Sequence, residues 1–238
     1  MKHQKLLSYM RRAVDDYNMI EEGDKIAIGV SGGKDSICLL LGLSGLKMFY
    51  PKHFDISAVT VSLGFPSSDF GEIRKLCQNL GVRYDVVDTD IGQIIFDLRK
   101  EENPCSLCSK MRKGALNDMA EKLGCNKVAL GHNKNDVIET FLMSLLYEGR
   151  INTFAPVSYL DRKKLYSIRP LMYVPEYEVI SYVKSSGIST VKNPCPANGT
   201  TKRQEIKELI SELGKKYDNV DEKIFGAIKR SNIKGYGK

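Results

Sequence analysis

Short apolar runs alternate with longer segments of helical periodicity over the first two-thirds of the chain. Five such runs have the length and the content of β-branched residues that are typical of strands: residues 25–30, 55–63, 82–87, 127–130 and 165–168. Helices are predicted between them at residues 35–49, 72–80 and 104–124, with Ile37, Leu40, Leu41 and Met48 of the first helix available for packing. Strands separated by helices predict right-handed βαβ units, and therefore an α/β fold with a parallel sheet and helices on both of its faces.

The pattern changes after about residue 170, where prolines become frequent. Pro175 followed by Glu176 is typical of a helix start. Helices are predicted there over residues 175–186, 200–213 and 221–233. We therefore expect a main domain over residues 1–170, with an N-terminal helix within residues 1–22, and a helical C-terminal extension over residues 171–238.

Composition limits the class of protein. Hydrophobic residues make up 42% of the 238 residues and charged residues 27%, as in an ordinary globular protein. No run of 18 apolar residues predicts a membrane span, and residues 1–12 lack the features of a secretory signal, so a cytoplasmic protein is expected. The net charge is +7 and both ends of the chain are rich in lysine and arginine, which favours a polyanionic partner such as nucleic acid.

A glycine-rich loop, SGGKDS, follows the first predicted strand at residues 31–36. Its spacing does not match a Walker loop, in which four residues separate the first glycine from the Gly-Lys pair. Its glycines, amides and hydroxyls nevertheless suit a phosphate, and an acid beside the lysine suits a magnesium ion. The residues expected to bind the nucleotide are Ser31, Gly32, Gly33, Lys34, Asp35 and Ser36, with Asp35 as the magnesium ligand.

Three cysteines are placed to hold a metal or to react. Asn103 and Pro104 predict a helix start, which puts Cys105 and Cys108 on one face of the first turns and favours their thiolates. Cys195 lies between two prolines, which present its thiol in a rigid loop. A zinc site, a redox pair and an iron–sulfur site are all compatible with the C-x-x-C spacing. The remaining cysteines, Cys38, Cys77 and Cys125, are expected to be structural.

The SGGKDS loop resembles the pyrophosphatase loop (PP-loop) of the N-type ATP pyrophosphatases, which implies a Rossmann-like fold and cleavage of ATP between its α- and β-phosphates. Residues 130–140, LGHNKNDVIET, resemble the G-H-x-x-D-D-x-x-E-T segment of the tRNA-thiolating branch. Asn135 replaces the first acid of that pair, and Asp136 is retained. The resemblance adds Gly131 and His132 to the nucleotide site, although packing for His132 and helix capping for Asp136 would be ordinary roles too.

The segment PCSLCS, the basic residues after it, and residues 169–171 and 193–196 resemble the iron–sulfur tRNA 2-thiocytidine synthase family. The resemblance implies a [4Fe-4S] cluster on three cysteines, with one iron open to sulfide, and adenylation of a pyrimidine C2 carbonyl, that of cytidine, in tRNA. The implied catalytic residues are Cys105, Cys108, Cys195, Lys34, Asp35 and Asp136. The residues expected to contact tRNA are Lys110, Arg112, Lys113 and Arg203.

Two other functions remain open at this point. The cysteines could carry a persulfide in turn, without a cluster, in a tRNA thiolase of the same ATP chemistry. The chain could also be a non-catalytic nucleotide-binding or metal-sensing module. The modified tRNA position and the sulfur donor, sulfide or persulfide, are not determined by the sequence, and a homodimer is possible. The chain lacks the flanking zinc-finger cysteines of related 2-thiouridine enzymes.

Overall fold

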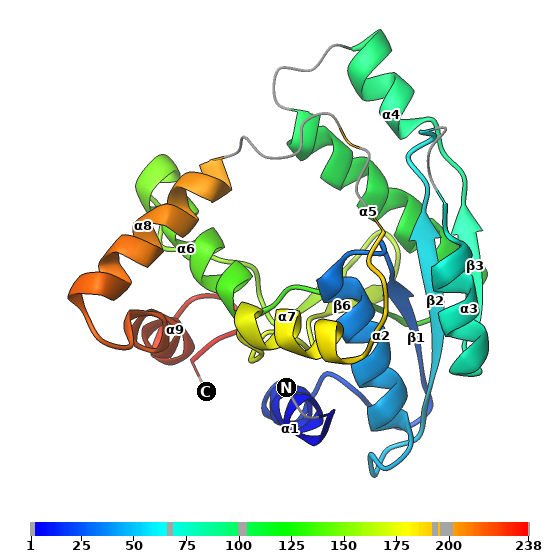
Figure 1. Cartoon of the computed structure of the whole chain (residues 1–238), viewed down its shortest axis with the longest axis horizontal. Helices are drawn as coiled ribbons and strands as arrows, with labels where there is room; N and C mark the ends of the chain where they lie inside the picture. The colour runs from blue at the N-terminus through cyan, green and yellow to red at the C-terminus, as the bar shows by residue number, and fades with distance from the viewer. Residues whose placement is uncertain (1–2, 66–68, 100–103, 192–194, 196–201, 238) are drawn as a thin grey trace.

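A six-stranded sheet in the order β3-β2-β1-β4-β6-β5 forms the centre of the protein (Figure 1). The computed structural model describes residues 3–65, 69–99, 104–191, 195 and 202–237. The strands are β1 (Asp24–Gly29), β2 (Phe54–Val61), β3 (Arg83–Val87), β4 (Lys127–Ala129), β5 (Val157–Leu160) and β6 (Leu165–Ile168). All neighbouring strands pair in parallel except β5, which is antiparallel to β6. The predicted α/β fold is confirmed.

The edge strand β5 was not predicted from the sequence. It forms a hairpin with β6, in which Val157 pairs with Ile168 and Leu160 with Leu165. None of its residues is fully buried. A four-residue strand at a sheet edge therefore shows neither a continuous apolar run nor a clean alternation, and the pairing with β6 decides its conformation.

The helices follow the predicted pattern with shifts of a few residues at their ends. They are α1 (His3–Asp16), α2 (Lys34–Lys47), α3 (Gly71–Asn79), α4 (Ile91–Gln93), the π-helix η1 (Ile94–Leu98), α5 (Pro104–Lys122), α6 (Lys134–Glu148), α7 (Glu176–Ser185), α8 (Lys202–Lys216) and α9 (Val220–Arg230). The short α4 and η1 were not predicted. No helix in the described part of the chain is long and apolar enough to cross a membrane.

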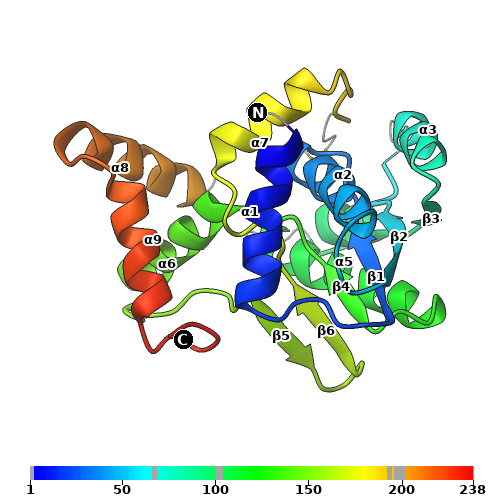
Figure 2. The same cartoon turned by 90° about the horizontal axis from the view of Figure 1, so that it is seen from below.

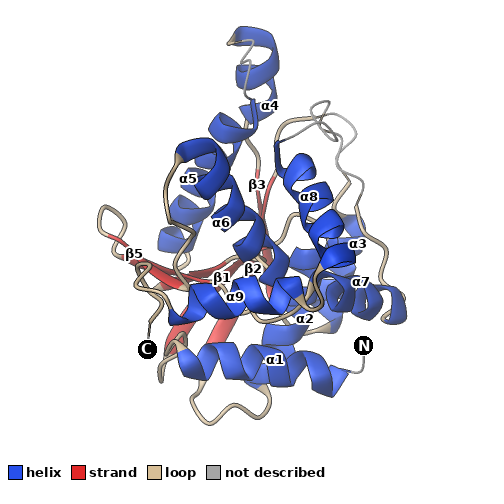
Figure 3. Cartoon of the chain, turned by 90° about the vertical axis from the view of Figure 1, so that its left-hand side faces the viewer, coloured by secondary structure: helices blue, strands red, loops and turns tan. Residues whose placement is uncertain are grey.

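Helices cover both faces of the sheet, as alternate side chains of the strands require. Ile26 and Ile28 of β1 face the larger core, which α1, α2 and α3 help to form. Ala27 faces a smaller core on the other side, where it packs with Leu116 of α5. Figure 3 shows α5 and α3 on opposite sides of the strands. In α2, Ile37 and Leu40 are buried as predicted, whereas Met48 is 84% exposed because it lies just after the helix, so its predicted packing was wrong.

The C-terminal extension shares the larger core with the sheet. Ile206 of α8 and Phe225 of α9 belong to the same buried cluster as Ile26 and Ile28. Helix α7 packs on α2, and α8 and α9 pack on α6, as Figures 1 and 2 show. The predicted boundary at residue 170 marks a change in the order of strands and helices along the chain. A division of the chain into two domains at this residue remains a prediction.

The order of the sheet reverses between β1 and β4. From β1 the chain proceeds through β2 to β3 in one direction, whereas β4 is followed by β6 on the other side. The loops that leave the carboxyl ends of β1 and β4 therefore lie next to each other. In open α/β sheets this position is where ligands bind.

Candidate active site

The loop after β1 is shaped by hydrogen bonds between its own serines. The Ser31 amide donates to Ser36 Oγ at 3.2 Å, and the Ser36 hydroxyl donates to the Gly33 carbonyl at 2.9 Å. Gly33 is the N-cap of α2, with an extended backbone and no side chain to cap the helix. The first amides of α2 are therefore available to an anion, in keeping with the predicted phosphate site.

Gly32 is the tightest point of the loop. Its φ is +81°, and a Cβ there would lie 2.7 Å from the Cβ of Val191. The Val191 amide donates to the Gly32 carbonyl at 3.0 Å. The segment that follows α7 therefore contacts the nucleotide loop directly through Val191.

The loop after β4 lies against the start of α2. A Cβ on Gly131 would be 3.2 Å from the Asp35 carbonyl oxygen, a tight contact that would require the start of α2 to shift by a few tenths of an ångström. Asn133 donates from its side chain to Asp35 Oδ1 at 2.9 Å. Asn133 and Asp136 also form a capping box at the start of α6, with a 2.9 Å bond from the Asn133 amide to Asp136 Oδ2. Burial raises the pKa of Asp136.

Lys34 is held between two carboxylates. Its Nζ lies 2.8 Å from Asp35 Oδ2 and 3.0 Å from Glu176 Oε1 at the start of α7. Burial acts to lower the pKa of Lys34, but the two carboxylates outweigh it and raise the pKa. Asn135, which replaces an acid of the related motif, accepts from the Glu176 amide at 2.9 Å and so orients α7 toward Lys34.

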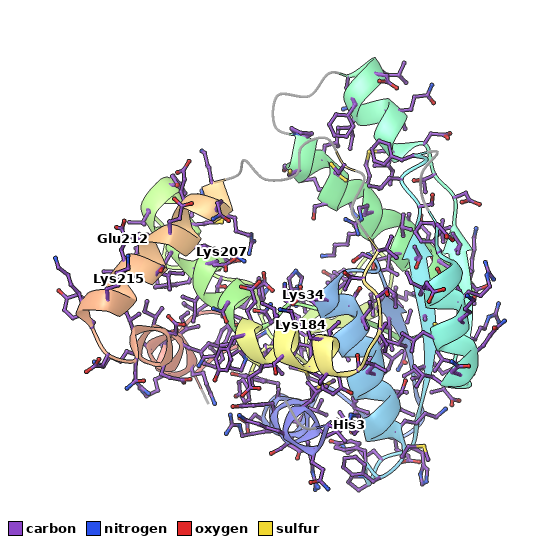
Figure 4. All side chains as sticks on the ribbon, viewed as in Figure 1. His3, Lys34, Lys184, Lys207, Glu212 and Lys215 are labelled. Carbon is purple, nitrogen blue, oxygen red and sulfur yellow. The ribbon has the colours of Figure 1, made fainter. Side chains whose placement is uncertain are left out.

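Helix α8 brings two cations to the same acids. Lys207 Nζ lies 3.1 Å from Glu176 Oε2, and Figure 4 shows Lys34 and Lys207 approaching from α2 and α8. Arg203 Nη1 donates to Asp136 Oδ1 at 3.1 Å and to Glu139 Oε2 at 3.0 Å. Arg203 was expected to contact tRNA, but in this structure its guanidinium neutralises acids of the nucleotide site.

The three cysteines expected to act together lie on one cavity. Cys105 and Cys108 are in the first turns of α5, and Cys195 belongs to the segment beyond Val191. Burial raises the pKa of Cys108, the neighbouring Cys195 and Cys105 raise it further, and Arg112 opposes them. Asn103, the predicted N-cap, and residues 193, 194 and 196 lie outside the described residues. The remaining cysteines are buried as predicted: Cys38, Cys77 and Cys125.

The cavity has a volume of about 650 Å³ and joins the nucleotide loop to the thiols. Its wall contains these predicted site residues: Ser31, Asp35, Ser36, Cys105, Cys108, Arg112, Lys113, Gly131, His132, Asp136 and Cys195. Gly32, Gly33, Lys34, Lys110 and Arg203 are not part of this wall. Most of the residues that the sequence analysis assigned to the site therefore line a single cavity in the fold.

Among the wall residues that the sequence analysis did not assign to the site, Phe154 and Arg169 matter most for its chemistry. The His132 ring lies on Phe154 with centroids 4.7 Å apart, and its Nδ1 is buried without a hydrogen-bond partner. Burial, helped by Arg169, lowers the pKa of His132 to about 3, so the ring is neutral at physiological pH. Phe154 has no signal in the sequence, whereas Arg169 lies in the segment that resembles the thiolating enzymes.

The donor set is compatible with a cluster. Cys105, Cys108 and Cys195 line one cavity. Three cysteine thiolates are a ligand set of the kind that holds a four-iron cube, in which each cysteine binds a different iron. The nearby Arg112 helps to offset the negative charge that such a ligand set carries.

Fold and loop together define a PP-loop protein. A model of the PP-loop domain family matches residues 4–213, and the chain belongs to this family. It is 35% identical over 240 residues to the tRNA-cytidine(32) 2-sulfurtransferase of Geobacter sulfurreducens, covering 100% of this chain and 90% of the relative. It is 37% identical over 237 residues to the protein of the same name from Dichelobacter nodosus, covering 97% and 89%. These relatives place the chain in the tRNA-cytidine(32) 2-sulfurtransferase family.

Solved structures agree with the fold. The U34-tRNA thiolase NcsA from Methanococcus maripaludis, solved with its [4Fe-4S] cluster, aligns with a TM-score of 0.75 at 24% identity, covering 94% of this chain and 78% of that one. The NH3-dependent NAD synthetase of Campylobacter jejuni aligns with a TM-score of 0.50 at 17% identity, covering 95% and 93%. At these identities the likeness confirms the Rossmann-like architecture.

Proposed function

We propose that the protein is an ATP-dependent tRNA sulfurtransferase, which replaces the C2 oxygen of a cytidine by sulfur. The observation that carries the proposal is the single cavity that joins the nucleotide loop to Cys105, Cys108 and Cys195. The names of the relatives support position 32 of tRNA as the target. As such an enzyme, the protein would work in the cytoplasm.

The residues of the loop suit the first half of this reaction. Amides of α2 and the Lys34 ammonium bind the ATP phosphates and stabilise the charge that develops on them. The C2 oxygen of the base attacks the α-phosphorus, and pyrophosphate leaves. This step turns a carbonyl oxygen, a poor leaving group, into the oxygen of an adenylate. Sulfur then bonds to C2, the C–O bond breaks, and AMP departs.

The cofactors are assigned to residues as follows. Cys105, Cys108 and Cys195 would hold a [4Fe-4S] cluster, which when bound supplies an open iron position for sulfide. Asp35 would bind Mg²⁺ together with the ATP phosphates. Both Asp35 oxygens accept hydrogen bonds, from Asn133 and Lys34, so the ion would replace at least one of these donors.

The partners follow from the same assignment. Lys110, Arg112 and Lys113 follow the C-x-x-C pair on α5 and would contact tRNA phosphates, which makes binding weaker as salt rises. The sulfur donor is sulfide or a persulfide. A homodimer is compatible with the family, but no feature of the described residues requires it. A persulfide mechanism on the same cysteines is the second candidate, because Cys108 has both other thiols as neighbours.

The test is mass spectrometry of tRNA nucleosides from cells that lack the gene and carry a plasmid copy. The intact gene should restore 2-thiocytidine, and Cys195→Ser should not. Cys125→Ala, a buried cysteine away from this cavity, serves as the matched control and should restore the nucleoside.

Restoration of 2-thiocytidine by Cys195→Ser would contradict the assignment of the thiols. Thionucleoside levels that do not depend on the gene would contradict the proposed function itself. The iron and sulfide content of the anaerobically purified protein separates the two mechanisms: a four-iron cluster supports the first candidate, and active protein without iron supports the persulfide route.

A further inference from the structure

Arg169 is a buried cation without a counter-charge in the described part of the chain. The residue is 6% exposed and follows directly after β6. Its Nη1 donates to the Ala155 carbonyl at 2.6 Å, and its guanidinium lies 4.9 Å from the Phe154 ring. Its Nε is buried and has no hydrogen-bond partner, and the side chain forms part of the cavity wall.

Such an arrangement of a buried guanidinium costs free energy of folding. Burying a charge without a partner, and leaving a donor unsatisfied, both oppose folding. Burial lowers the pKa of Arg169 to about 10, which leaves the guanidinium charged at neutral pH. A second cation adds to the cost: partial desolvation and the Arg169 charge together lower the pKa of Lys113 on α5, which lines the same cavity.

Arg169 disfavours the charge of Lys113, and both cations line one cavity, so an anionic ligand between them would be favoured. The neighbouring His132 is neutral and adds no competing charge. The acids of the site, Asp35 and Asp136, are already paired with Lys34 and Arg203. Arg169 and Lys113 are therefore cations of this wall without a carboxylate partner among the described residues, and the third such cation, Arg112, interacts with the Cys108 thiol.

The proposed reaction narrows the choice of anion. The glycine loop and Lys34 bind the phosphates that leave as pyrophosphate, and the cytosine ring carries no negative charge. One anionic group remains in the cavity after pyrophosphate leaves, the phosphoryl group that joins AMP to the base. We propose that Arg169, assisted by Lys113, binds this phosphoryl group and retains AMP on the enzyme until sulfur displaces it. This inference rests on the proposed function.

The test compares the binding of AMP with that of adenosine by titration calorimetry on the full chain. The two ligands share base and ribose and differ in the phosphate, so their affinity ratio isolates the phosphate contact. We expect Arg169→Gln to lower the preference for AMP over adenosine by about tenfold or more, since it removes a charge-assisted hydrogen bond. Lys113→Gln should lower it less, and adenosine affinity should not change in either variant.

Controls distinguish phosphate binding by Arg169 from a purely structural role of this residue. Lys122→Gln removes the same charge from the last turn of α5, away from the cavity, and should leave the preference unchanged. A folding defect in Arg169→Gln would lower the affinity for both ligands together. Lys113 is exposed at the cavity rim, so Lys113→Gln folds normally and keeps the test decisive even then.

Full AMP preference in both Arg169→Gln and Lys113→Gln would overturn the inference and leave the proposed function intact. Wild-type protein that binds neither ATP nor AMP would overturn the proposed function and the inference together. A preference abolished in Arg169→Gln, reduced in Lys113→Gln and kept in Lys122→Gln supports the inference.

Discussion

Gly32 meets two demands that a side chain cannot meet together. Its backbone lies in the left-handed region, and Val191 occupies the place that a Cβ would need. The glycine therefore serves both the curvature of the loop and the packing of the segment that covers it.

Gly32→Ala should lower the free energy of unfolding by about 2 kcal/mol or more and weaken ATP binding, because both backbone strain and a clash are introduced. Gly124→Ala is the matched control: its φ is +68°, but no atom lies within 4 Å of the added Cβ. Urea denaturation of both variants separates strain from clash. An equal loss of stability in the two variants would show that Val191 does not press on the loop.

His132 offers a second test at this scale. With a folded pKa of about 3, against an ordinary value of 6.5, the unfolded chain binds one more proton between these two values. The stability contribution of His132 is therefore lost as the pH falls below about 6.5, and it is fully present above that value.

His132→Gln should reduce the loss of stability between about pH 7 and pH 4 by about 1–2 kcal/mol relative to the wild type, since glutamine takes up no proton. Denaturation at a series of pH values measures the difference. The carboxyl groups of the site titrate in both proteins and cancel in the comparison. Parallel pH profiles would show that the pKa of His132 is the same in the folded and the unfolded chain.

Among the elements, α8 connects the C-terminal extension to the nucleotide site. Glu139 of α6 is buried, with a side chain 2% exposed, and depends on Arg203 at 3.0 Å and on Lys207 at 3.7 Å, both from α8. Lys207 also contacts Glu176, which contacts Lys34. The helix therefore supplies the counter-charges of acids that belong to other elements.

Arg203→Met should lower the free energy of unfolding by about 2 kcal/mol, because it leaves a buried carboxylate with a weaker partner. The double variant Arg203→Met with Glu139→Gln should recover most of this stability, since the unpaired charge is gone. Thermal denaturation provides the measurement. If the single variant is as stable as the wild type, Arg203 is free to contact tRNA as the sequence suggested.

The sequence predicted the elements best where burial is strong. Strands β1 and β2 and helix α2 have continuous apolar runs, and the structure moves their ends by one or two residues. Strand β5 and helices α4 and η1 were not predicted, because tertiary contacts rather than a local sequence pattern determine their conformation.

The residues of the site also fall into those that a local sequence pattern predicts and those that it does not. The glycine loop and the C-x-x-C pair could be found because each lies within a few consecutive residues. Glu176 and Arg203 act through partners far away in the chain, and no local pattern reveals such pairs. The ion pairs of Arg203 could not be foreseen for the same reason, and its expected role in tRNA binding stays a prediction.

At the scale of the whole molecule, the two basic ends of the chain meet. The Arg12 guanidinium of α1 lies 5.1 Å from the centroid of the Tyr173 ring, and Lys229 Nζ of α9 lies 4.3 Å from the same centroid. Both line a cavity of about 250 Å³. Figure 2 shows helices α1 and α9 on the same side of the molecule. Asp16 accepts from Lys229 at 3.5 Å and offsets part of the charge.

Replacing Arg12 and Lys229 by glutamine should weaken tRNA binding and reduce the slope of log affinity against log salt by about one unit for each phosphate that is no longer neutralised. Binding measured over a series of salt concentrations tests this. Lys163→Gln, which removes a cation near the β5–β6 turn, is the control and should keep the slope. An unchanged slope in the double variant would place the tRNA elsewhere on the surface.

The contact of Val191 with Gly32 also has a consequence for how the protein is made. Cys105 and Cys108 leave the ribosome long before Cys195, whose segment follows α7 and contacts the glycine loop through Val191. A nascent chain therefore presents two thiols without the third. On the proposed assignment, the three-thiol site is complete only once Cys195 has been synthesised, so synthesis in iron-starved cells should accumulate a precursor that lacks its cofactor.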